Sequence, residues 1–310
     1  MSTPKVSIIV PSYNHAPYLK ERLDSILGQT FRDFELIILD DSSTDNSQQI
    51  IEQYSSEPRV SHVVYNKINS GNTFVQWQKG VDLAQGEWIW IAESDDVAQP
   101  TFLSKCLQRD NDKVGLVFCD SQFIDYHGQL LDAGRFNRKL PQEMRGSDFV
   151  VNHMLRRNRL YNASMAIFRR SLFEKVPLDY VSKRHLGDWY FWIAIAQNSQ
   201  QVSYVKEPLN GFRQHQNKVS VDGLKSGECI IEEDGLTNYL ARYYYYVPKP
   251  YWQWSRLLTL HRLKRNKFLT PEQKENILLA LDGSPQNYGS QVAYYFWEYL
   301  KLLTPLKLKI

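Results

Sequence analysis

The sequence predicts an α/β fold in which a mostly parallel sheet is flanked by helices, followed by a C-terminal helical region. In the first hundred residues, short apolar runs rich in β-branched residues alternate with segments whose apolar residues recur at helical spacing. From about residue 226, helical segments rich in aromatic and basic residues replace that alternation. We therefore expect one domain over residues 1–225, with halves 1–100 and 101–225, and a helical region over 226–310.

Strands and helices alternate through the first half. Each strand is a short buried apolar run, and the strands are predicted at Val6–Val10, Phe34–Leu39, Val60–Tyr65 and Trp88–Ala92. One helix follows the first strand and carries Leu19, Leu23 and Ile26 on its apolar face. Another carries Ile50 and Ile51, and a third ends near Ala84 before Gly86. This order is typical of parallel strands joined by crossover helices.

Residues 101–225 are less regular. Strands are predicted at Gly115–Cys119, Tyr161–Phe168, Val202–Lys206 and Leu209–Arg213, with a hairpin turning at His127–Gly128. An aromatic-rich buried helix is predicted over Asp188–Gln197. Ligands of such sheets bind beyond the carboxyl ends of the parallel strands, where Tyr13, Asp40–Asp41 and Asp95–Asp96 all fall.

The composition excludes several classes of protein. There are 37 Lys and Arg and 34 Asp and Glu, so the net charge of +3 is too small for an electrostatic nucleic-acid binder. The cysteines Cys106, Cys119 and Cys229 are too few and scattered for a disulfide framework or a zinc site. The chain has no signal-peptide pattern and no apolar run long enough to span a membrane. We expect a cytoplasmic protein.

Two acidic pairs mark the predicted strand ends. Asp95–Asp96 suits Mg²⁺ or Mn²⁺ shared with a substrate phosphate, because adjacent carboxylates repel each other unless a cation or hydrogen-bond donors offset their charge. Alternatively, the pair lies in a solvated turn that caps a helix. Asp40–Asp41 has the same two interpretations, with a base or ribose as the ligand.

Three further residues are candidates for chemistry. Asp188 precedes the apolar face of a helix, where it acts either as an N-cap or as a general base. Arg213 and His215 could bind a diphosphate or a metal, although such a pair in a loop is more often incidental. The sequence lacks a Gly-rich phosphate-binding fingerprint, which argues against a dinucleotide enzyme or a P-loop NTPase.

Taken together, these motifs resemble the family 2 glycosyltransferases, which are inverting enzymes. The resemblance covers about residues 5–220 and rests on the order of its motifs, which are Val6–Asn14, Leu39–Ser47, Ala84–Asp96, Gly187–Trp189 and Phe212–Asn217. It implies a nucleotide-diphospho-sugar transferase fold (GT-A) and a divalent Mn²⁺ or Mg²⁺ ion on the donor diphosphate.

The resemblance also implies roles for single residues. Pro11, Tyr13, Asp40 and Asp41 would line the nucleotide site, and Asp95 would bind the ribose or support the metal. Asp96 would bind the metal directly. His215 would touch the metal or the diphosphate, Arg213 would bind the donor, and Asp188 would be the catalytic base.

The sequence departs from the family pattern at several positions. Glu93 stands where many members have Asp, and Gly187 stands where many have an acid. The stretch Phe74–Gly80 lacks an Arg-Asn pair that often contacts the donor. The absence of a Gln-x-x-Arg-Trp motif favours transfer of a single sugar over polymerisation.

The C-terminal region combines Tyr and Trp with Lys and Arg, notably in Tyr243–Tyr246 and the segment up to Lys267. This composition suits a peripheral contact with the inner face of the cell membrane, and equally a helical subdomain packed on the catalytic core. The tail Tyr294–Leu303 could dock on the core or on a second protomer.

We therefore expect an inverting, metal-dependent enzyme that moves one sugar from a nucleotide-sugar, by family habit a UDP-sugar, to a hydroxyl of a saccharide or lipid-linked acceptor. Bacterial surface polysaccharide synthesis is the expected setting. The alternatives are a sugar nucleotidyltransferase on a similar fold and a non-catalytic protein that binds nucleotide-sugars.

Overall fold

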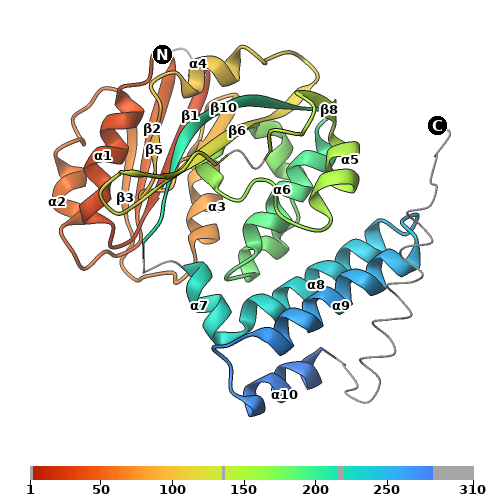
Figure 1. The fold of residues 1–310 in the computed structure, drawn as a ribbon. Helices are drawn as coiled ribbons and strands as arrows, with labels where there is room; N and C mark the ends of the chain where they lie inside the picture. Colours follow the sequence, from red (N-terminus) through yellow and green to blue (C-terminus); the bar gives the residue numbers. More distant parts are fainter. Residues whose placement is uncertain (1–2, 135–136, 216–218, 282–310) are drawn as a thin grey trace. The chain divides into compact units, whose positions relative to one another are not determined.

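The computed structural model describes residues 3–134, 137–215 and 219–281, and the predicted docking tail Tyr294–Leu303 lies outside them. The chain divides into two compact units, residues 1–215 and 216–310. This division falls after His215, whereas the sequence analysis placed the boundary after residue 225. Unit 1 is an α/β sandwich and unit 2 is helical (Figure 1).

The predicted parallel strands form one half of a single sheet. Its strand order is β3-β2-β1-β4, and these strands span Val60–Tyr65, Phe34–Asp40, Val6–Ser12 and Trp88–Ile91, respectively. All three pairings are parallel, and Ser12 lies opposite Asp40 at the carboxyl end. Every residue of β1, β2 and β4 is buried, as expected for strands covered on both faces.

Helices connect these strands and cover the sheet (Figure 1). They are α1 (Ala16–Leu27), α2 (Ser47–Glu52) and α3 (Thr73–Leu83). The face of α1 that packs inward carries Leu19, Leu23 and Ile26, as the sequence predicted. Asn72 caps α3 by accepting a hydrogen bond from the backbone N–H of Phe74.

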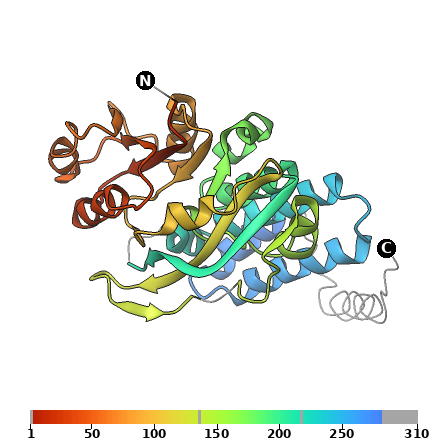
Figure 2. The same cartoon turned by 90° about the horizontal axis from the view of Figure 1, so that it is seen from above.

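The sheet continues as β4-β9-β6-β10-β5. These further strands are β5 (Val97–Ala98), β6 (Val114–Ile124), β9 (Ala166–Arg169) and β10 (Gln201–Arg213), with β7 (Leu130–Asp132) on β6 and β8 (Glu143–Arg145) on β10. β6 and β10 pair in parallel, whereas β9 is antiparallel to both β4 and β6. The β6–β7 hairpin projects from the sheet (Figure 2).

Three predicted strands differ from the structure. The strand expected over Tyr161–Phe168 begins only at Ala166, because a 3₁₀ turn over Ala163–Met165 precedes it. The two short strands expected around Glu207 are one strand, β10, whose register shifts between Val205 and Asn210. A β-bulge of this kind accommodates Pro208, which has no N–H to donate to the ladder.

The remaining helices of unit 1 pack near the second half of the sheet. They are α4 (Phe102–Leu107), α5 (Gly146–Phe149), the π-helix η1 (Val150–Met154), the 3₁₀ helices η2 (Ala163–Met165), η3 (Arg170–Lys175) and η4 (Leu178–Ser182), and α6 (Gly187–Asn198). Trp192 and Phe191 of α6 are fully buried beside Phe168 of β9. Much of the chain's aromatic content therefore belongs to the core of unit 1.

In the residues of unit 2 that the structure describes, the helices are α7 (Val219–Ser226), α8 (Glu228–Tyr243), α9 (Lys249–Arg265) and α10 (Pro271–Ala280). Its small core contains Ile230, Leu263, Leu269, Ile277 and Leu281. Within the described residues, no helix combines the length and the apolar character needed to cross a bilayer.

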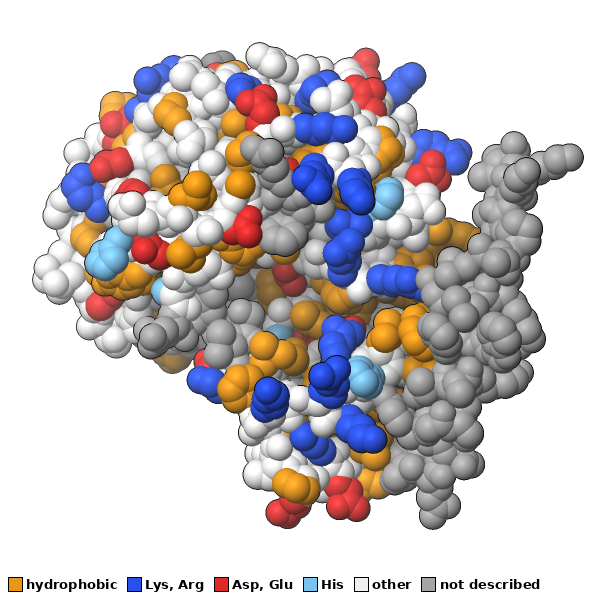
Figure 3. All heavy atoms as spheres, in the orientation of Figure 1, with side chains coloured by type: hydrophobic (Ala, Val, Ile, Leu, Met, Phe, Trp, Pro, Cys, Tyr) orange, Lys and Arg blue, Asp and Glu red, His pale blue; other side chains and the backbone are white. Residues whose placement is uncertain are grey.

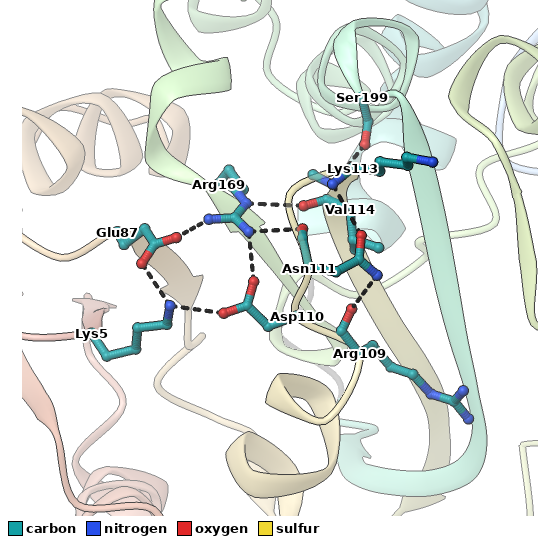
Figure 4. A network of polar contacts seen from close by, with 10 residues as sticks. Lys5, Glu87, Arg109, Asp110, Asn111, Lys113, Val114, Arg169 and Ser199 are labelled. Carbon is teal, nitrogen blue, oxygen red and sulfur yellow. Dashed lines mark hydrogen bonds and ion pairs between the residues drawn. The ribbon is translucent and has the colours of Figure 1, made fainter.

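Charged side chains join the amino ends of several strands. Arg169 of β9 forms ion pairs with Glu87 and Asp110, and Lys5 bonds to the same two carboxylates (Figure 4). The guanidinium of Arg169 also lies 4.7 Å from the centroid of the Trp88 ring. This network ties the edge of the sheet that is opposite to the strand carboxyl ends.

Candidate active site

Three potential metal ligands meet beyond the carboxyl ends of the sheet. His15 follows β1, Asp95 follows β4 and His215 follows β10. One ligand atom from each residue lies within 4.8 Å of the others. Nε2 of His215 is 2.9 Å from Oδ2 of Asp95. The sheet thus brings together residues from three distant stretches of the chain.

A contact with a buried hydroxyl group fixes the position of His15. Nδ1 of His15 lies 2.7 Å from the hydroxyl of the buried Ser94, which fixes the ring beside Asp95. Burial lowers the pKa of His15, and nearby His215 lowers it too, whereas Asp95 raises it. A lowered pKa keeps the His15 ring neutral near pH 7, so that a nitrogen lone pair is available to a cation.

Asp96 has a different environment from Asp95. Its side chain is fully buried, Oδ2 accepts a hydrogen bond of 2.7 Å from Asn162, and Oδ1 accepts one of 3.1 Å from the backbone N–H of Arg213. Burial, helped by the neighbouring Asp95, raises the pKa of Asp96 to about 6. The sequence predicts a direct metal contact for Asp96 and a supporting position for Asp95. In the structure Asp95 lies beside His15 and His215, whereas the carboxylate of Asp96 accepts hydrogen bonds from Asn162 and Arg213.

The guanidinium of Arg213 is bonded to other groups of the protein. Its Nε donates to the carbonyl of Asp95, Nη1 donates to the carbonyls of Asp125 and Tyr126, and Nη2 pairs with Glu21 at 2.5 Å. Every guanidinium nitrogen therefore has a protein acceptor. The prediction that Arg213 binds the donor stays a prediction, and it would require these contacts to be exchanged.

A second arginine lies beneath the acidic loop. Arg22 of α1 is fully buried, its guanidinium is 4.9 Å from the centroid of the Trp90 ring, and its nitrogens have no hydrogen-bond acceptor among the described residues. Burial lowers its pKa to about 10, while Asp96, Asp95 and Glu93 oppose that shift. Arg22 therefore supplies positive charge to a loop crowded with carboxylates.

Glu93 belongs to this buried charge cluster. Its Oε1 accepts a hydrogen bond of 2.8 Å from the indole of Trp77, and burial together with Asp95 raises its pKa to about 8. The Glu93 carboxyl is therefore held inside the protein by Trp77.

The Asp40–Asp41 pair ends β2 beside the same edge. Oδ2 of Asp40 accepts hydrogen bonds from the backbone N–H of Ser43 and from Gln48, whereas its buried Oδ1 has no partner among the described residues. Asp41 holds the loop before α3, since Asn66, Ser70 and Gln76 all donate to its carboxylate. Only Asp40 therefore keeps an unused acceptor.

Pro11 and Tyr13 flank this edge differently. Pro11 is buried inside β1, opposite Leu39 of β2, and Tyr13 is 45% exposed after the strand ends. Asn14 adopts a positive φ of 53° and its side-chain oxygen accepts a hydrogen bond from the N–H of Thr44. This contact ties the loops after β1 and β2 together.

Asp188 lies in the first turn of α6. Its Oδ2 accepts a hydrogen bond of 2.8 Å from Asn158, and Oδ1 accepts one from the N–H of Trp189. The side chain is partly exposed. Asn72, which precedes α3, donates to the carbonyls of Val181 and Lys183, and these bonds connect the start of α3 to the segment before Asp188.

Sequence reasoning missed His15 and Arg22. His15 directly follows Tyr13 and Asn14 at a strand end, so its position in the pattern could have suggested it. Arg22 falls at helical spacing with Leu19, Leu23 and Ile26, and a charged residue on an apolar face was the available signal.

Comparison with known proteins gives consistent matches. The family model described as Glycosyl transferase family 2 matches residues 7–177. The putative glycosyltransferase EpsH of Bacillus subtilis is 29% identical over 229 residues, which are 71% of this chain and 63% of that protein. Glycosyltransferase GlyG of Streptococcus pneumoniae is 33% identical over 186 residues, 60% of this chain and 52% of that protein. The chain thus spans less than two thirds of either relative.

Solved structures share the fold across nearly the whole chain. TarS 1–349 of S. aureus in complex with UDP-GlcNAc has a TM-score of 0.60 at 18% identity, covering 95% of this chain and 92% of that one. The mannosyltransferase PcManGT of Pyrobaculum calidifontis, in complex with GDP-Man and Mn²⁺, has a TM-score of 0.56 at 17% identity, covering 100% and 89%.

Proposed function

The chain belongs to glycosyl transferase family 2 and has the GT-A fold, and from this premise we propose that it transfers one sugar from a nucleotide-sugar to an acceptor hydroxyl with inversion at the anomeric carbon. The observation that carries the proposal is the meeting of His15, Asp95 and His215 at the strand carboxyl ends. Ligand sites of open α/β sheets occur at this edge.

We assign the metal to these three residues. Two imidazole nitrogens and one carboxylate oxygen fit a divalent cation, and the set favours Mn²⁺ over Mg²⁺, because Mg²⁺ prefers oxygen ligands throughout. A bound cation supplies positive charge to the diphosphate that leaves the sugar. Asp96 and Asn162 would then position Asp95 and the end of β10, rather than bind the cation.

The donor would bind along the ends of β1 and β2. The unused Oδ1 of Asp40 can accept a hydrogen bond from a base N–H, and the exposed ring of Tyr13 can pack against the base. The similar structures hold UDP-GlcNAc and GDP-Man, which supports a nucleoside diphosphate sugar without choosing between bases. UDP remains our first choice.

The reaction is a single displacement. The acceptor oxygen attacks the anomeric carbon as the bond from that carbon to the phosphate oxygen breaks, and the nucleoside diphosphate leaves with the bonding electrons. The acceptor proton passes to a carboxylate oxygen of Asp188, whose hydrogen bond from Asn158 orients the group. Charge balances because the departing diphosphate gains the one negative charge that the Asp188 carboxylate loses on protonation, while the acceptor hydroxyl becomes a neutral glycosidic linkage.

The names of two relatives support a role in the synthesis of cell-envelope polysaccharide. One is named as a putative teichuronic acid biosynthesis glycosyltransferase and another as chondroitin synthase, so a saccharide or lipid-linked acceptor in bacterial polysaccharide synthesis is our proposal. Peripheral membrane contact through unit 2 and self-association stay proposals as well. The family match lends no support to the alternative of a sugar nucleotidyltransferase.

A screen of nucleotide-sugars with Mn²⁺ tests the proposal. We expect one donor to raise the melting temperature and to be hydrolysed slowly without an acceptor. Asp188→Asn should bind that donor normally and fail to transfer its sugar. Donor binding without turnover across many acceptors would favour the non-catalytic alternative, and no binding of any nucleotide-sugar would reject both.

A further inference from the structure

Resting on the proposed function, we propose that Tyr18 is a further substrate-binding residue, whose hydroxyl donates a hydrogen bond to an oxygen of the donor diphosphate. Tyr18 lies in the first turn of α1, shortly after His15 in the chain. Its backbone N–H donates to the carbonyl of His15 at 2.9 Å. The start of α1 therefore fixes Tyr18 relative to one of the three residues to which we assign the metal.

The ring of Tyr18 packs against both candidate histidine ligands. Its centroid lies 5.9 Å from that of His15 and 5.3 Å from that of His215. The ring of Tyr126, in the turn of the β6–β7 hairpin, lies 5.3 Å away. The guanidinium of Arg213 lies 5.0 Å from the centroid of the Tyr18 ring. Side chains from three separate stretches of the chain thus hold this ring in one place beside the candidate metal ligands.

The hydroxyl of Tyr18 has no partner within the described part of the chain. The side chain is only 7% exposed, and its oxygen makes no hydrogen bond to any residue that the structure describes. The hydroxyls of Tyr54 and Tyr65, by contrast, donate to Asp24 and Glu52. A buried tyrosine normally finds such a partner, because an unpaired polar group away from water costs free energy. A ligand beside the candidate metal site would supply the missing acceptor to Tyr18.

The chemistry of the phenol favours a charged acceptor. A tyrosine hydroxyl carries its proton near neutral pH and therefore acts as a donor. A hydrogen bond to an ionised oxygen is about twice as strong as one between neutral groups. The diphosphate of a nucleotide-sugar would bring ionised oxygens to His15, Asp95 and His215, whereas the hydroxyls of the sugar are neutral. The diphosphate is therefore the part of the donor that suits Tyr18 best.

The basic side chain that packs on Tyr18 is already engaged by the protein. Each guanidinium nitrogen of Arg213 donates to a carbonyl or to Glu21. On the face that Figure 3 draws, exposed Lys and Arg side chains gather over the region where Figure 1 draws α5 and α6, whereas α1 lies on the other side of unit 1 in that view. The Tyr18 hydroxyl is thus a donor that the protein leaves unused beside the candidate metal ligands.

Calorimetry on the full chain tests this contact with UDP and with GDP, each at saturating Mn²⁺. Tyr18→Phe keeps the ring and removes only the hydroxyl. We expect this variant to bind the nucleoside diphosphate about tenfold more weakly than the wild type, because one hydrogen bond to a charged group is lost. The affinity for the corresponding nucleoside, uridine or guanosine, is measured by competition and should not change, since a nucleoside has no phosphate.

Two controls separate the hydroxyl from packing and from the metal. Tyr54→Phe makes the same chemical change at a hydroxyl that donates to Asp24 at 2.7 Å, and it should leave the affinity for UDP and GDP unchanged. Binding of Mn²⁺ without nucleotide, followed by electron paramagnetic resonance, should be the same in Tyr18→Phe and in the wild type.

The outcomes distinguish this inference from the proposed function. An unchanged affinity of Tyr18→Phe for UDP and GDP overturns the inference. An equal loss for the nucleoside also overturns it, because the hydroxyl would then contact the base or the ribose. A matching loss of Mn²⁺ affinity overturns it as well, since Tyr18 would act only through the histidines. If the wild type binds neither UDP nor GDP, the proposed function itself is rejected, and the role of Tyr18 with it.

Discussion

Nε2 of His215 lies 2.9 Å from Oδ2 of Asp95, although 120 positions separate the two residues in the chain. The contact exists because β10 ends beside the loop that follows β4. The next residue along that loop strengthens the junction, since the buried Asp96 accepts a hydrogen bond from the backbone N–H of Arg213. Two adjacent carboxylates thus face opposite ways, one toward the histidines and one into the protein.

This division of roles predicts different defects for Asp95→Asn and Asp96→Asn. The first should lose Mn²⁺-dependent donor turnover at least a hundredfold with its melting temperature little changed. The second should destabilise the fold by about 1–3 kcal/mol, because an amide places a donor against Asn162 or the N–H of Arg213. Turnover with titrated Mn²⁺ and urea unfolding measure the two effects. Equal losses of metal affinity in both variants would contradict the assignment of Asp95.

Arg213 and Glu21 form an ion pair of unequal burial. The Arg213 side chain is 1% exposed and that of Glu21 is 53% exposed. Arg213→Met should therefore cost about 3–5 kcal/mol of stability, because four backbone or carboxylate acceptors lose a buried charge partner. Glu21→Gln should cost less than about 1 kcal/mol, since its carboxylate is solvated. Urea unfolding of both variants checks this, and similar losses would contradict a buried anchoring role for Arg213.

The parallel half of the fold was predictable because each strand is a contiguous apolar run and each helix has a regular apolar face. The irregular segments were not predictable from the sequence. Ser164 and Asn162 lie in a stretch that reads as a continuous strand, yet a 3₁₀ turn there directs them toward Glu93 and Asp96. Local propensity does not encode such contacts between distant segments.

The site was predictable only as a set of strand ends. The positions of Asp95 and Asp96 in the chain placed both at the carboxyl edge of the sheet, where they lie, but their side chains point in opposite directions, and no sequence signal says which one faces the histidines. His15 follows β1, so the same reasoning from strand ends could have identified it. The orientation of Arg213 into the protein depends on the carbonyls of Asp125 and Tyr126, which belong to a separate hairpin turn.

Thiol reactivity should separate the three cysteines. Cys106 and Cys119 are fully buried, and burial raises the pKa of both thiols. Cys229 is partly exposed, and burial and Glu233 raise its pKa as well. At pH 8 a chromogenic disulfide reagent should therefore modify Cys229 slowly and leave the other two intact until urea is added. Cys229→Ser should abolish the native reaction. Rapid native labelling of Cys106 would show that the core between α4 and β6 opens.

Gly80 of α3 should be essential to the packing of that helix on β1. A Cβ built at Gly80 would lie 2.3 Å from Cγ2 of Ile9, so Gly80→Ala forces a clash inside a close-packed core. We expect a loss of about 1–3 kcal/mol, despite a helix propensity that favours Ala over Gly by about 1 kcal/mol.

The background variant Ile9→Ala removes the clashing atoms and supplies the control for Gly80→Ala. In that background the same Gly80→Ala change should become stabilising. The added methyl group fills the cavity left by the Ile9 side chain, and no clash offsets the higher helix propensity of Ala. Urea unfolding of the two single variants and the double variant measures the coupling free energy. A Gly80→Ala effect of the same sign and size in both backgrounds would mean that α3 does not approach β1 at Ile9.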